Sequence, residues 1–322
     1  MKSINIQGII AKLRNEDERW DAILELKLLH DRQAVPELVK LLEDKDWLIR
    51  WSVAEKLGDL RDARALPALA KCLADADRHV VRNAYKAIQK YGSGAVSVIV
   101  PYFEHKESSV RNSVYSLIKE MGAAAIPAME KIVFALNPIV ASRIVHTIWA
   151  IQGPMAEKTL IQLLDVPNLR RQIIVLLGQM KSAGALPKLL GLYSDPKIKK
   201  LVLVAFKNVG EDKFFDFIIR SYLYGEKNSR LRALEVIQKV GKFLVPSLIK
   251  KVIEEPKEAA HIFPLVERLD MGLALRILEK NAPKNRELTP FIKELKRKSA
   301  AAGVSPAESK GIRGFIDELF GK

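Results

Sequence analysis

Residues 44–59 read Asp-Lys-Asp-Trp-Leu-Ile-Arg-Trp-Ser-Val-Ala-Glu-Lys-Leu-Gly-Asp, and residues 65–69 read Ala-Leu-Pro-Ala-Leu. Weaker copies of this phrase return along most of the 322-residue chain, each with a basic residue after a polar turn. The basic residues lie 27 to 32 positions apart: Arg19, Arg50, Arg82, Arg111, Arg143, Arg170, Lys199 and Arg230. A period in this range predicts a stacked repeat array. Because such an array has no built-in cleft, we expect it to offer a binding surface.

Each copy of the phrase predicts two helices. Apolar residues follow the basic residue at helical spacing, and a glycine then stands where a helix stop is expected: Gly58, Gly92, Gly122, Gly153, Gly178, Gly210 and Gly241. The next helix opens near a proline, which suits a first helical turn: Pro36, Pro67, Pro127, Pro187 and Pro246. The pattern predicts an all-α, right-handed solenoid of about eight helical-hairpin repeats.

The phrase at 44–59, with its Ala-Leu-Pro-Ala-Leu continuation, resembles the HEAT repeat in its short bacterial or archaeal form. That form is shared with the phycobilisome-lyase-type HEAT repeats, and the resemblance covers about residues 14–254. It implies that the acidic turns and the basic residues after them pair between neighbouring units as a structural ladder. The ladder residues would be Arg19, Arg50, Arg82, Arg111 and Arg143.

The two ends of the chain depart from the repeat, as the ends of a solenoid must. We expect a solenoid over 1–297, with an N-terminal capping helix at 1–14, the clearest repeats at 15–254 and degenerate helices at 255–297. Residues 298–311 predict a flexible linker. Residues 312–322 predict a short amphipathic tail helix with one apolar stripe: Ile312, Phe315, Ile316, Leu319 and Phe320. This stripe either caps the last repeat or docks into a separate partner.

Positive charge is concentrated in one part of the chain. Of a net charge of +15, residues 168–251 carry +11, from 17 Lys and Arg against six acids. A local field of this size favours an acidic or polyanionic partner. The repeats predict a basic binding surface in this segment, made of Arg170, Arg171, Lys199, Lys200, Arg230 and Arg232.

Few residues suggest catalysis. None of the five histidines is followed by Glu, which excludes deoxyhypusine hydroxylase, a HEAT-repeat enzyme whose di-iron centre needs His-Glu pairs. The sequence lacks a Gly-Lys-Ser/Thr phosphate loop and a Gly-x-Ser-x-Gly elbow. We therefore expect no catalytic residue, no metal ligand and no cofactor. A single cysteine, Cys72, and the absence of a membrane-length apolar run or visible signal peptide predict a cytoplasmic protein.

These observations favour a non-enzymatic scaffold or adaptor for an acidic partner protein. A nucleic-acid-binding protein like the alkylpurine DNA glycosylases is the first alternative, since tryptophans among cations suit stacked bases: Trp20, Trp47, Trp51 and Trp149. A phycobilin-lyase-like enzyme or chaperone is the second. The sequence leaves the oligomeric state and the identity of the partner open.

Overall fold

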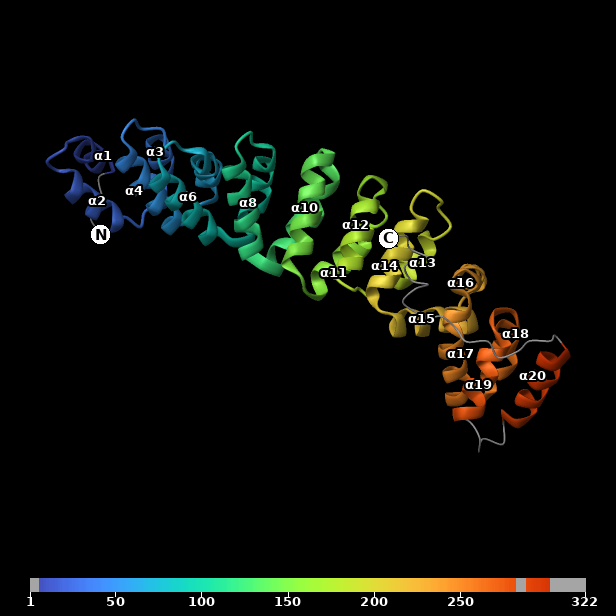
Figure 1. Ribbon diagram of the computed structural model, residues 1–322. Helices are drawn as coiled ribbons and strands as arrows, with labels where there is room; N and C mark the ends of the chain where they lie inside the picture. The colour runs from blue at the N-terminus through green and yellow to red at the C-terminus, as the bar shows by residue number, and fades with distance from the viewer. Residues whose placement is uncertain (1–5, 282–287, 302–322) are drawn as a thin grey trace. The chain divides into compact units, whose positions relative to one another are not determined.

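The computed structural model describes residues 6–281 and 288–301 of the chain (Figure 1). Within these residues every regular element is a helix, so the fold is the all-α solenoid of repeats that the sequence predicts. The chain divides into two compact units, Met1–Leu169 and Arg170–Lys322. The boundary falls in the first turn of helix α12 (Pro167–Gln179).

Unit 1 alternates long and short helices. The longer helices that carry the basic residue of each repeat are α2 (Arg19–Lys27), α4 (Trp47–Leu60), α6 (Arg78–Tyr91), α8 (Ser108–Met121) and α10 (Pro138–Ile151). Their partners are α3 (Val35–Leu41), α5 (Leu66–Lys71), α7 (Val96–Ile99), α9 (Ile126–Ile132) and α11 (Gly153–Leu163). Helix α1 (Ile6–Arg14) packs against α2. The helices α4, α6 and α8 lie side by side in one layer (Figure 1).

Unit 2 also contains paired helices, and it ends in three further helices. The repeat helices are α12, α13 (Leu186–Leu192), α14 (Lys199–Val209), α15 (Glu211–Tyr224), α16 (Lys227–Val240) and α17 (Val245–Glu254). Here α15 is longer than α14. Helices α18 (Ala259–Leu269), α19 (Met271–Asn281) and α20 (Thr289–Ala301) pack on one another beside α17. Short 3-10 turns connect many of the helices of both units: Arg32–Ala34, Ala63–Ala65, Cys72–Ala74, Gly92–Ala95, Val100–Glu104, Gly122–Ala125, Val133–Ala135, Gly241–Leu244 and Pro256–Glu258.

The core of each unit is a row of aliphatic side chains from successive helices. On α6 the buried residues include Ala84 and, one turn later, Ala87 and Ile88, on the face toward the neighbouring helices. Each fully buried Ile, Leu or Val contributes about 1.5–3 kcal/mol. The polar turns set where the long helices begin, because Asp46 accepts from the Leu48 amide at 2.9 Å and Asp77 from the His79 amide at 2.7 Å.

Two of the glycines predicted as helix stops lie inside the helices that they were expected to end, and a third, Gly153, opens α11. Gly92 and Gly122 do end α6 and α8, with φ of +58° and +61°. Gly58 lies within α4, however, where an added Cβ would stand 2.6 Å from the Cα of Ala87 on α6. Gly178 occupies the same place in α12. In the repeats that contain Gly58 and Gly178, glycine permits a close helix–helix approach instead of a left-handed stop.

The helices at the two ends of the described residues differ slightly from the boundaries that the sequence predicts. The expected capping helix at 1–14 is described from Ile6, as α1. Helix α20 continues to Ala301, so residues 298–301 are helical where the sequence predicts the start of the linker. The rest of the predicted linker and the tail residues Ile312, Phe315, Ile316, Leu319 and Phe320 lie outside the described residues.

Candidate functional site

The buried residues fix the register of the long helices. The long helices bury a set at positions x, x+3 and x+4, for example Ile173, Leu176 and Leu177 on α12, and Val202, Ala205 and Phe206 on α14. Helix α2 is an exception, because its x+3 residue is the half-buried Glu25. We call x−3 the ladder position; the corresponding residues are Arg19, Arg50, Val81, Arg111, Ala141, Arg170, Lys199 and Arg230. We call x−2, x+2 and x+6 the ridge. These three positions lie one turn apart on the side of the helix away from the buried set.

In the first repeats the ladder residue joins two neighbouring repeats of unit 1. Arg50 donates from Nε and Nη2 to both carboxylate oxygens of Asp75, each at 2.8 Å, and from Nη1 to the carbonyls of Asp44 and Lys45. Arg19 lies 3.0 Å from Asp46 of the next turn. Burial raises the pKa of Asp75, but hydrogen bonds from Arg50 and the Asp77 amide outweigh it, and the net shift is downward. Arg50 therefore joins its own turn to the turn of the following repeat.

Arg82 and Arg143, two of the five predicted ladder residues, occupy other positions. The ladder position of α6 is Val81, and Arg82 lies on the exposed ridge, where the described residues give it no ion pair. Arg143 lies two residues past the ladder position of α10 and donates to the Phe103 carbonyl. Arg111 is in register, but it donates to the carbonyls of His105 and Lys106 in its own turn.

Three of the six cations of the predicted basic surface hold neighbouring segments of unit 2 together. Lys199 pairs with Glu235 of α16, and its Nζ lies 4.4 Å from the centre of the Tyr193 ring. The hydrogen bond from Lys199 to Glu235 raises the lysine pKa. Arg230 donates to the Gly225 carbonyl at 2.6 Å, and Arg232 to the Ser194 hydroxyl at 3.1 Å. These three side chains are engaged within the protein.

The remaining cations differ in exposure. Arg170 is half-buried and engaged with other groups of the protein. Arg171 is exposed on the ridge of α12, although it donates to the Lys197 carbonyl at 3.0 Å. Lys200 is exposed on the ridge of α14. Lys227, the first residue of α16, is also exposed. Sequence reasoning did not select it, because it considered only the repeated basic position and its immediate neighbours.

Exposed aliphatic side chains lie among these cations. Val175, Val204 and Leu231 are 42%, 41% and 58% exposed. Each follows an exposed cation by four residues in its own helix, in the pairs Arg171–Val175, Lys200–Val204 and Lys227–Leu231. Residues four apart are neighbours on a helix surface. Unit 2 thus presents a mixed surface of cations and aliphatic groups on the helices α12, α14 and α16, which we call the α12–α14–α16 surface.

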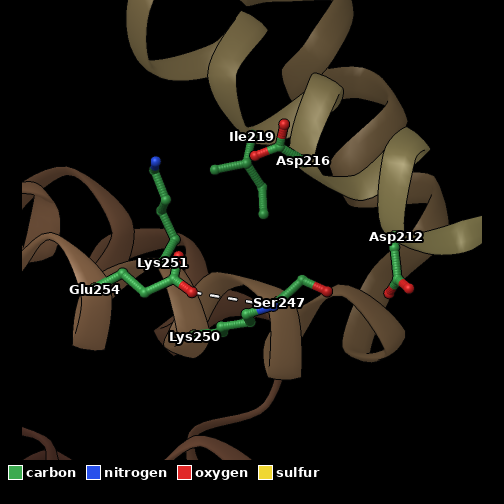
Figure 2. Close-up of a pocket in the computed structure, with 7 residues that line it drawn as sticks. All are labelled: Asp212, Asp216, Ile219, Ser247, Lys250, Lys251 and Glu254. Carbon is green, nitrogen blue, oxygen red and sulfur yellow. Dashed lines mark ion pairs between the residues drawn. The ribbon is translucent and has the colours of Figure 1, made fainter. Parts of the chain in front are cut away.

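A small cavity of about 90 Å³ lies in unit 2 between α15 and α17. Figure 2 shows Asp212 and Asp216 reaching it from α15, and Lys250, Lys251 and Glu254 from α17. Most of these charges have partners on their own helix: Asp216 with Arg220 at 2.9 Å, Lys250 with Glu254 at 4.0 Å and Lys251 with Glu255 at 2.7 Å. Across the described residues no three His, Cys, Asp or Glu side chains are grouped to hold a metal ion.

The tryptophans are dispersed. Trp20 is 65% exposed on the ridge of α2, in a column with Leu24 and Leu28. Trp47 contacts the ring of His79, and Trp149 the ring of His146, but no ring contact in the described part of the chain joins two tryptophans. The structure therefore does not assemble these four side chains into one stacking site.

The stacked helical hairpins, with a ladder between neighbouring repeats and exposed ridges, define an α-helical repeat protein. Residues 6–89 match the family model of HEAT repeats, so this part of the chain consists of HEAT repeats. The comparison with curated proteins gave no match. In the part of the chain described, helices that could cross a membrane were not found.

Several solved structures resemble the chain at low identity. The complex of CpcE and CpcF of phycocyanin lyase from Nostoc sp. PCC7120 is 18% identical, covering 73% of this chain and 94% of that one, with a TM-score of 0.32. Human deoxyhypusine hydroxylase in complex with glycerol is 16% identical over 72% and 93% of the two chains, with a TM-score of 0.31. Importin beta is 12% identical over 98% and 54%, with a TM-score of 0.35. At these values none of their activities transfers to this chain.

Proposed function

We propose that this chain is a non-enzymatic scaffold or adaptor that binds an acidic partner protein through the α12–α14–α16 surface. A HEAT-repeat array is a scaffold capable of binding proteins. The observation that carries the finer proposal is the pairing of exposed cations with exposed aliphatic side chains on α12, α14 and α16.

The mixed chemistry of this surface favours a protein over a nucleic acid. Cations such as Lys200 and Lys227 attract an acidic partner and orient its approach. Val204 and Leu231 supply apolar area that a partner's side chains can cover, as in the core of a protein interface. Base stacking needs aromatic side chains, and these ridge positions carry none.

The test compares two double charge reversals in the full-length chain. Lys200→Glu/Lys227→Glu alters the surface at two exposed cations with no partner among the described residues, and Lys45→Glu/Lys106→Glu makes the same change in net charge on exposed turns of unit 1. The probe is poly-L-glutamate, titrated at about 0.1 M salt so that only charges within about 10 Å interact strongly. We expect the first variant to bind at least about fivefold more weakly than the second, or about 1 kcal/mol.

Equal affinities of the two variants would contradict the proposal, because the attraction would then follow net charge alone. Duplex DNA is titrated in parallel. If DNA binds more tightly than poly-L-glutamate, with an affinity that falls steeply with salt, the nucleic-acid alternative is correct instead.

The C-terminal tail belongs to the same proposal, as a cap or as a docking motif. Deleting Gly311–Lys322 distinguishes the two roles. A lower melting temperature supports the cap, whereas unchanged stability with weaker capture of an identified partner supports docking. If neither property changes, the tail has neither role.

A further inference from the structure

A second basic feature lies in unit 1, where the net charge of the sequence is nearly balanced. Arg78, Arg82, Lys86 and Lys90 are spaced four residues apart along α6, and all four are exposed. Residues four apart stack on one side of a helix. They form a single line of cations, which we call the α6 column. At about 1.5 Å per residue the column is about 18 Å long, with about 6 Å between successive members.

Three members of the column have no carboxylate partner within the described residues. Lys90 is held by Asp59 of α4 at 2.6 Å, whereas Arg78, Arg82 and Lys86 make no ion pair there. These three instead line an open cavity of about 450 Å³ between α6 and α8. Unpaired cations beside a cavity of this size leave room for an anionic group of a ligand.

The carboxylate that lines this cavity already accepts hydrogen bonds. Glu120 of α8 accepts from the side-chain amide of Gln89 at 3.0 Å. Burial is the main cause that raises the pKa of Tyr85, and a hydrogen bond to Glu120 is the second. The tyrosine therefore stays neutral and donates to Glu120. Glu120 therefore leaves Arg82 and Lys86 free, and Tyr85 adds a flat apolar side chain between the cations.

The column is one helix wide and has acids on both sides. Asp59 lies on the α4 side and Glu120 on the α8 side, and α4, α6 and α8 are neighbours in the layer (Figure 1). A nucleic-acid duplex needs a broad basic surface, and its phosphates would meet these carboxylates at the cost of like-charge repulsion. A single narrow acidic chain along the column meets fewer carboxylates, since Glu120 already accepts from Gln89 and Asp59 already pairs with Lys90.

We infer that the α6 column is a binding site for an extended acidic peptide segment with carboxylates at alternate residues. In a β-strand, side chains on one face recur every two residues, about 6.6–6.8 Å apart. This spacing matches the steps of about 6 Å along the column to within the reach of Arg and Lys side chains. About seven residues of strand span the whole column. The intervening residues contact Val81 and Tyr85, which line the same cavity.

The site is independent of the α12–α14–α16 surface and is tested separately on the full-length chain. The probe is a fluorescein-labelled Glu-Ser-Glu-Ser-Glu-Ser-Glu peptide, compared with a block peptide of the same composition, Glu-Glu-Glu-Glu-Ser-Ser-Ser, by fluorescence anisotropy at about 0.1 M salt. We expect Arg82→Glu/Lys86→Glu to weaken binding of the alternating peptide by about tenfold or more. The control variant Lys106→Glu/Lys131→Glu reverses two exposed cations of unit 1 outside the column. It should change the affinity for the alternating peptide by less than about twofold.

A neutralised variant, Arg82→Gln/Lys86→Gln, guards against misfolding of the reversed one, and should lose affinity to a smaller extent. Lys200→Glu/Lys227→Glu should bind the peptide as the wild type does, which separates this site from the proposed function. Equal binding of the alternating and block peptides overturns the assignment of an extended, alternating ligand. Equal losses in the column and control variants, or tighter binding of a single-stranded octanucleotide, overturn the site itself.

Discussion

Replacing Arg50 by alanine tests whether the ladder between neighbouring repeats stabilises the array. Arg50 and Asp75 are 14% and 10% exposed, and their paired hydrogen bonds are both 2.8 Å long. An exposed pair contributes about 0–1 kcal/mol, whereas breaking a fully buried pair costs about 3–5 kcal/mol. The substitution also removes two bonds to turn carbonyls, while Asp75 keeps its bond from the Asp77 amide at 2.8 Å. We therefore expect a loss of about 2–4 kcal/mol.

Urea denaturation, with thermal melting as a second measurement, measures this loss. For a unit of this size it corresponds to a fall in melting temperature of roughly 5–15 °C. Because repeat arrays can unfold in more than one step, hydrogen exchange of the α4 and α6 amides locates the effect. The matched control is Arg82→Ala, which removes the same side chain from an exposed position without an ion pair and should change stability by less than about 0.5 kcal/mol.

A double-mutant cycle of Arg50→Ala with Asp75→Ala isolates the pair. We expect a coupling of about 1–3 kcal/mol, as for contacting groups in one network. A loss below about 1 kcal/mol together with no coupling would refute the reasoning, because solvent would then screen the ladder despite its low exposure.

Three further outcomes follow from the packing. Since the Asp75 pKa is lower in the folded state, its stabilisation is complete above about pH 4 and is lost as pH falls further; urea midpoints of Arg50→Ala should show a shallower acid loss than wild type. Gly58→Ala should cost about 1–3 kcal/mol of unfolding free energy through overpacking against α6, whereas Gly191→Ala, with open space around it, should be neutral or stabilising by up to about 1 kcal/mol. Leu24→Gln should leave the melting temperature unchanged within about 2 °C, since the side chain is 61% exposed.

The repeat period was readable from the sequence because helix packing repeats the same residue types at the same spacing. The acidic turns, such as the one at Asp46, cap the long helices as their composition suggests. The role of each glycine could not be predicted from the sequence in the same way. Gly58 and Gly92 occur at similar places in successive copies, yet one permits close packing and the other ends a helix. The difference depends on the residue opposite, which lies in another repeat and cannot be inferred from local pattern.

The basic surface shows a second limit of the sequence. Counting charge along the chain selects residues 168–251, but it does not separate cations that are engaged from those that are exposed. Lys199 and Lys200 are adjacent in sequence, and only Lys199 reaches Glu235. A side chain's partner depends on its direction around the helix, which successive residues change by about 100°.

This rotation also explains the α6 column. The turn residue Asp46 precedes its arginine by four positions, whereas Asp77 precedes Arg82 by five. The additional residue puts Val81 at the ladder position and turns Arg82 onto the ridge, in line with Lys86 and Lys90. The repeat that contains α6 therefore has a cation that faces solvent where the preceding repeat has one that joins two turns. The sequence contained this signal, but its meaning required the buried set that fixes the register of the helix.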